Sequence, residues 1–233
     1  MIDLWHSVSK SALGRPIEVV ADNRRNHPEL RMMKDECNVA SPAGYKGKVV
    51  LSVWLESFPN LKPLILNHEI GHWVLKFKGF RGMICNPRDK LKEGLLNDVA
   101  SHRPLYCLQK SVGHDPQSEV DSRCDHNIKL YSQPGFPDKV VSVLYLVDDL
   151  LNCSYKKRSQ LEWTLRRNHP SILQIVERIL TIASNHDLSI PDQNIEFRKK
   201  LVKELNLSGV WSEKDDVKST KSLIFEVEGR APS

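Results

Sequence analysis

The chain has 233 residues, of which 40% are hydrophobic and 27% charged, with 11 Gly and 13 Pro. This composition is typical of a soluble globular protein, and it excludes collagen-like and low-complexity chains. The formal net charge is +5, and the basic residues gather only in short clusters, at Lys156 to Arg158, Arg166 to Arg167 and Arg198 to Lys200. We expect these clusters to be solvated helix faces, so the composition argues against a nucleic-acid partner.

The apolar runs of the sequence are short. The longest, Val49 to Leu55 and Val140 to Val147, fall well below the ~18 residues that a membrane-spanning helix needs. The first residues lack the basic and apolar regions of a signal peptide. The five cysteines are odd in number and widely spaced, which is typical of thiols in a reducing compartment. We therefore expect no membrane segment and a cytoplasmic location.

The first third of the chain changes from strand patterns to a helix pattern. Runs rich in β-branched and aromatic residues, separated by turn signals such as Ser41-Pro42-Ala43-Gly44, predict strands at Pro16 to Val20, Glu36 to Ala40 and Lys48 to Glu56. After Phe58-Pro59 the sequence predicts a helix over residues 61–78, with Asn60 as its N-cap and Gly79 as its stop.

The remainder of the chain is predicted to be mainly helical. A second helix begins at Asn86-Pro87 and ends at Ser101 or His102, before Pro104. Residues 115–137 are interrupted by Pro and Gly and indicate a loop. Further helices are expected over residues 138–151, 170–184 and 192–205. From Ser208 onward the sequence is polar and rich in lysine, and we expect a mobile tail.

The residues that carry chemistry read His68-Glu69-Ile70-Gly71-His72, the pattern H-E-x-x-H, inside the first predicted helix. Residues four apart lie on the same helix face, so both imidazoles can bind one Zn²⁺ while Glu69 projects toward its open side. The alternative is a hydrogen-bonded pair of core histidines beside a surface carboxylate. The largely apolar helix counts against it, because each buried unpaired polar group costs roughly 1–3 kcal/mol.

A catalytic zinc also needs a third protein ligand and an open fourth position. The second predicted helix offers Glu93, which shares a face with Asn97, and Asn97 could orient a ligating histidine through the free N–H of its ring. His102 is an alternative third ligand, with Asp98 either as its hydrogen-bond partner or as the ligand itself. Periodicity alone leaves Glu93, His102 and Asp98 open.

The order of these elements resembles a known family. A strand at Lys48 to Glu56, the H-E-x-x-H helix and a second helix that carries a ligand resemble the gluzincin branch of the zincin metallopeptidases, over roughly residues 36–104. Glu93-x-x-x-Asn97-x-Val99-Ala100 also resembles the second-helix pattern of the ImmA/IrrE-type peptidases, which are associated with cleavage of transcriptional repressors. This resemblance favours Glu93 as the third ligand.

The expected fold class is α+β and zincin-like, with an N-terminal mixed β-sheet packed on the active-site helix and a helical C-terminal half. One domain is expected over residues 1–207. Its sheet and H-E-x-x-H helix occupy residues 1–82, and its helical part with the third ligand occupies residues 83–207. The tail covers residues 208–233.

The expected activity is that of a zinc metallopeptidase with one Zn²⁺ per chain and a peptide or protein substrate. Glu69 would act as general base on a water that the metal activates. Candidate donors to the developing oxyanion come from the following segment, namely Tyr106, His114, His126 and Tyr131. The alternative is a non-catalytic or regulatory interaction protein that uses zinc to hold its fold; Glu69 favours catalysis, because structural sites are closed by four ligands. The oligomeric state stays open.

Overall fold

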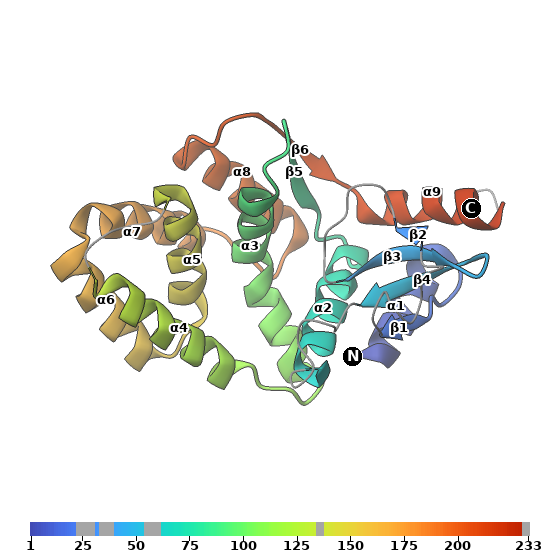
Figure 1. Ribbon diagram of the computed structural model, residues 1–233, viewed down its shortest axis with the longest axis horizontal. Helices are drawn as coiled ribbons and strands as arrows, with labels where there is room; N and C mark the ends of the chain where they lie inside the picture. Colours follow the sequence, from blue (N-terminus) through green and yellow to red (C-terminus); the bar gives the residue numbers. More distant parts are fainter. Residues whose placement is uncertain (22–30, 33–39, 54–61, 134–137, 230–233) are drawn as a thin grey trace. The chain divides into compact units, whose positions relative to one another are not determined.

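A computed structural model describes residues 1–21, 31–32, 40–53, 62–133 and 138–229 (Figure 1). The architecture is α+β and mostly helical, which confirms the predicted fold class at this level. The chain has two compact units, where the sequence analysis expected one domain over residues 1–207. Unit 1 comprises Met1–Gly79 and Asp215–Ser233, and unit 2 comprises Phe80–Lys214.

Unit 1 contains a four-stranded sheet in the order β1-β4-β3-β2, with bounds β1 Val19–Ala21, β2 Arg31–Met32, β3 Ala40–Tyr45 and β4 Lys48–Val53. β1 runs parallel to β4, and the other pairs are antiparallel. The β3–β4 hairpin turns at Lys46-Gly47, where φ is 47° and 73°; two-residue hairpins require such positive values to match the twist of the strands. The expected turn Ser41–Gly44 therefore lies inside β3. The predicted strand residues 36–39 and 54–56 lie outside the described residues.

Two further helices of unit 1 were not predicted. α1 (Ile2–Leu13) buries Trp5, Ser9 and Leu13, a short stripe at i, i+4 and i+8 with a serine in its centre. α9 (Asp216–Glu228) begins at its N-cap Asp215, which accepts the Lys218 N–H, and buries Leu223 and Ile224. The region expected to be a mobile tail thus includes an ordered helix, because a few buried positions suffice to anchor a polar segment.

α2 (Lys62–Phe77) confirms the helix predicted over residues 61–78; its expected N-cap, Asn60, lies outside the described residues. Ile70, Trp73, Val74 and Phe77 are buried, at the i, i+3, i+4 and i+7 spacing of one helix face. The Trp73 indole N–H donates to the carbonyl of Ala40 in β3 over 2.9 Å. This packing fixes the rotation of α2 and leaves the H-E-x-x-H side chains on its half-buried side.

Unit 2 is a group of helices around one apolar core, with a small two-stranded sheet. α3 packs against α5 and α8, α5 also packs against α7, and α4 packs against α6 (Figure 1). The elements are β5 Gly82–Asn86, α3 Lys90–Ser111, α4 Gln117–Tyr131, α5 Lys139–Asn152, α6 Tyr155–Asn168, α7 Pro170–Ser184, α8 Pro191–Glu204 and β6 Val210–Lys214. The helices predicted over residues 138–151, 170–184 and 192–205 are confirmed as α5, α7 and α8.

Two helices of unit 2 were missed by the sequence analysis. α4 lies where a loop was expected, since Pro116 stands just before the helix rather than inside it. Its buried residues, Val120, Cys124, Asn127 and Tyr131, have helical spacing but include few aliphatic side chains. α6 buries only Leu161, Thr164 and Leu165, so its pattern is mostly polar. In the described part of the chain, no helix is long and apolar enough to span a membrane.

α3 differs from its prediction at both ends. Asn86 belongs to β5, and the N-cap is Asp89, which accepts the Lys92 N–H over 3.2 Å. The helix continues through Pro104 to Ser111, although proline has no N–H to offer the carbonyl four residues earlier. That carbonyl belongs to Ala100, and it accepts a hydrogen bond of 2.7 Å from the buried Asn194 side chain of α8. A partner from α8 thus compensates for the missing helix bond.

Candidate metal site

The two histidines of the H-E-x-x-H motif lie one above the other on α2 of unit 1. Their Nε2 atoms are 3.1 Å apart, and their rings meet edge to face with centroids 4.7 Å apart. His68, Glu69 and His72 are all half-buried. This part of the helix combines two converging ring nitrogens with a neighbouring carboxylate that solvent can reach.

The separation of the two Nε2 atoms agrees with a shared metal. Two nitrogens at about 2.05 Å from a tetrahedral Zn²⁺ would lie about 3.3 Å apart. The observed 3.1 Å corresponds to an N–Zn–N angle of about 98° at the same bond length. The distance between the two nitrogens therefore suits two ligands of one zinc ion.

In unit 2, an acidic residue fixes the orientation of a third histidine. His102 lies on the buried stripe of α3, and its Nδ1 is 2.8 Å from Oδ2 of Asp148 on α5. Both side chains are buried. A histidine whose Nδ1 is bonded to a carboxylate presents its Nε2 as the metal-binding atom, a common arrangement of ligand histidines.

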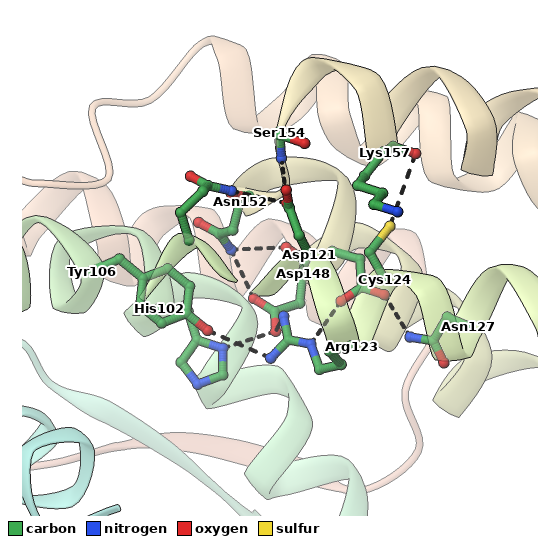
Figure 2. A network of polar contacts seen from close by, with 12 residues as sticks. His102, Tyr106, Asp121, Arg123, Cys124, Asn127, Asp148, Asn152, Ser154 and Lys157 are labelled. Carbon is green, nitrogen blue, oxygen red and sulfur yellow. Dashed lines mark hydrogen bonds and ion pairs between the residues drawn. The ribbon is translucent and has the colours of Figure 1, made fainter. Parts of the chain in front are cut away.

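Asp148 belongs to a larger network of charged side chains, which Figure 2 shows. Arg123 of α4 reaches Asp148 through Nη2 at 2.8 Å and donates from Nε to Asp149 at 2.7 Å. Asn152 donates from Nδ2 to Oδ1 of Asp148 over 2.9 Å. Three helices thus fix the position of one carboxylate.

The network shifts the protonation of its members. Burial lowers the pKa of His102, but the charge and hydrogen bond of Asp148 outweigh it and leave the pKa above its ordinary value. Burial raises the pKa of Asp148, yet His102 and Arg123 hold it below its usual range. Burial raises the pKa of Asp149. Asp148 is therefore an ionised partner for His102.

The carboxylate predicted as third ligand has other partners. Glu93 is buried at the start of α3, where its Oε2 accepts the Cys85 N–H over 3.2 Å and its Oε1 lies 3.2 Å from Arg88. Asn97 uses both ends of its amide on the backbone of Met83, at 2.8 and 2.9 Å. The contacts of Glu93 and Asn97 join α3 to β5. They also occupy the side-chain amide of Asn97, which was expected to orient a ligating histidine. Asp98 is half-buried, and its charge adds to the raised pKa of His102.

Of the four expected oxyanion donors, Tyr106 lies beside His102. It stands one turn later on α3, with its ring stacked on the imidazole at a centroid distance of 5.3 Å. Burial raises the pKa of Tyr106, so the phenol keeps its proton. The other three lie elsewhere in unit 2: His114 is 3.4 Å from Glu119, His126 is exposed on α4, and Tyr131 is buried with its carbonyl bonded to Asn168.

Within the described residues, His68 and His72 belong to unit 1 and His102 to unit 2, and each offers one ring nitrogen that could bind a metal ion. The sequence analysis named all three, His102 as an alternative. It missed Asp148 and Arg123. The sequence does contain a signal for Asp148, because Asp148 and Asp149 interrupt a largely apolar helix, and acidic side chains in such a helix are retained only with partners.

Comparisons with known proteins add no family assignment. No family model, curated protein or solved structure matches this chain significantly.

Proposed function

We propose that the protein is a zinc-dependent hydrolase that cleaves peptide bonds, with His68, His72 and His102 as zinc ligands and Glu69 as general base. The observation that carries this proposal is the approach of the two Nε2 atoms to 3.1 Å on one face of α2, with Glu69 next to the first of them. Imidazole nitrogen is a preferred zinc ligand, and three protein ligands leave the fourth position open, as catalytic sites require.

The choice of His102 over Glu93 rests on what each side chain already contacts. His102 receives its orientation from Asp148, which is the support that ligating histidines usually have. Glu93 accepts a backbone N–H and pairs with Arg88, so ligation would cost it these partners. Glu93 stays the alternative that the resemblance to gluzincins favours.

Each residue has a role in the proposed reaction. When bound, Zn²⁺ supplies Lewis-acid chemistry, which lowers the pKa of a water to about 7 and polarises a carbonyl. Glu69 accepts the proton of the attacking water and passes it to the leaving amine. Tyr106, which keeps its phenolic proton, is the candidate donor to the developing oxyanion. Asp148 is a positioning residue, since it acts through His102.

The experiment measures zinc and proteolysis on the same sample of the full chain. We expect one zinc per chain and cleavage of an unstructured protein such as casein, with loss of cleavage on treatment with a chelator and recovery on addition of zinc. Bound zinc without cleavage of casein or of a peptide library would support the non-catalytic alternative. A protein that stays metal-free in excess zinc would refute both.

A further inference from the structure

The exposed side of α6 presents an unusual combination of side chains. At about 100° per residue, seven exposed residues fall within about 140° of the helix circumference, and we call them the α6 face. They are Tyr155, Lys156, Ser159, Gln160, Trp163, Arg166 and Arg167. The opposite side holds the buried Leu161, Thr164 and Leu165. The α6 face is therefore a continuous surface that the packing of unit 2 leaves open to solvent.

This helix carries most of the net charge of the chain. α6 contains five basic residues and one acidic residue, a net charge of +4, whereas the whole chain has +5. The acidic residue, Glu162, lies outside the α6 face and pairs with Arg158 at 2.9 Å. Of the basic residues on the face, Arg166 approaches Glu177 of α7 at 3.7 Å, an exposed contact of the kind that contributes little. The face thus has three cations and no carboxylate.

Two aromatic side chains are exposed on the same face. Tyr155 is 85% exposed and Trp163 is 62% exposed, although burying such rings is strongly favourable. Arg167 places its guanidinium carbon 5.4 Å from the centre of the Trp163 ring. Cations beside open aromatic rings are the two components with which proteins bind single-stranded nucleic acid, phosphates by charge and bases by stacking.

We propose that the α6 face binds single-stranded nucleic acid, a function beyond the proposed hydrolase. The residues between the aromatic rings favour this ligand over a membrane. Ser159 and Gln160 are polar and exposed, whereas insertion into a lipid surface needs an apolar face of Leu, Phe or Trp. The sequence suggested only separate basic clusters; the helix places Lys156, Arg166 and Arg167 on one face with the two rings.

The test measures binding by fluorescence anisotropy of labelled 15-nucleotide strands to the full-length protein, over a range of salt concentrations. RNA and DNA strands are separate arms, with duplex DNA and vesicles of phosphatidylserine and phosphatidylcholine as further arms. Three phosphate contacts predict a slope of log K against log salt of about −2 for a single strand. We expect binding to at least one single strand and weaker binding to the duplex.

Two pairs of variants separate stacking from charge. Trp163→Ala should weaken binding about 5- to 150-fold, the range for loss of one stacked base, without changing the salt slope, and Trp163→Phe should restore most of it. The R166Q/R167Q double variant should weaken binding and bring the slope to about −0.7. The matched control K200Q/K203Q removes two exposed charges of α8 and should leave binding nearly unchanged.

Each alternative outcome overturns the proposal. Absence of binding to any single strand at low salt would refute it, as would equal losses for the α6 and α8 double variants. Unchanged binding of Trp163→Ala would show a simple charge attraction without a stacking platform. Binding to the vesicles that depends on the α6 face, without binding to single strands, would assign the surface to membranes. Circular dichroism of every variant ensures that only folded proteins are compared.

Discussion

The histidines of unit 1 and unit 2 are positioned in different ways. His68 and His72 are half-buried and contact each other across one turn of α2, so their geometry follows from a spacing of four residues. His102 is buried, and its partner Asp148 lies 46 residues later in the chain. A pair of converging ring nitrogens can therefore be encoded in five residues, whereas the orientation of a further histidine depends on the packing of three helices.

The largest expected effect concerns unit 1. Glu69→Gln should lower kcat by about 10²- to 10⁴-fold, the usual contribution of a general base, because the amide cannot accept the proton of the attacking water. Zinc content should stay at that of the parent, since the two histidines are unchanged. Casein cleavage and zinc analysis of the same sample check this. Cleavage at the parental rate would remove Glu69 from the mechanism.

The next effect concerns the network of unit 2. Arg123→Met leaves Asp148 and Asp149 without their shared cation and should lower the free energy of unfolding by about 3 kcal/mol. This figure is at the low end for buried pairs because the Arg123 side chain is 33% exposed. Urea unfolding measures the change. Arg158→Met, which breaks the exposed pair with Glu162, should lower the free energy of unfolding by less than about 1 kcal/mol. Equal decreases in the two variants would contradict the conclusion that the Arg123 network stabilises unit 2.

A smaller effect, on zinc affinity, shows whether Asp148 orients His102 or only stabilises the fold. Asp148→Asn should weaken zinc binding about 10- to 100-fold, since loss of a carboxylate behind a ligand histidine has that effect. The matched control is Asp149→Asn, which changes the neighbouring carboxylate that bonds Arg123 and Asn127 rather than His102. Competition with a chromophoric chelator measures both affinities. If Asp149→Asn weakens zinc binding as much, Asp148 serves the fold and not the ligand.

The smallest effect tests how α3 continues past Pro104. Asn194→Ala leaves the Ala100 carbonyl without its hydrogen bond and should cost about 2 kcal/mol. Pro104→Ala supplies the missing helical N–H, so the loss should be about 1 kcal/mol smaller in that background. A double-mutant cycle of urea unfolding gives this coupling. Strictly additive losses would show that Asn194 does not compensate for the proline.

The elements that the sequence predicted are those with local signals. α2 has an apolar stripe at helical spacing, and α5 and α7 begin at Asp138 and Pro170, strong signals for the start of a helix. α4 and α6 were missed because their buried faces are short and partly polar. The continuation of α3 through Pro104 could not be predicted, because the compensating Asn194 is 90 residues away in sequence.

The site residues likewise divide into those with a local sequence signal and those placed by tertiary packing. The H-E-x-x-H spacing is sufficient to bring two ring nitrogens together on α2. Asn97, which helical spacing placed beside Glu93, is instead used by the backbone of Met83, because β5 packs against that face of α3. Periodicity identifies a face of a helix, but tertiary packing decides what that face contacts.

X-ray absorption spectroscopy of the zinc-loaded protein tests the central proposal most directly. The account predicts one zinc per chain with three imidazole nitrogens at about 2.0–2.1 Å, loss of one of them in His102→Ala, and an unchanged spectrum in Glu93→Gln. A site with two imidazoles in the parent protein, or a first shell that changes in Glu93→Gln, would contradict it.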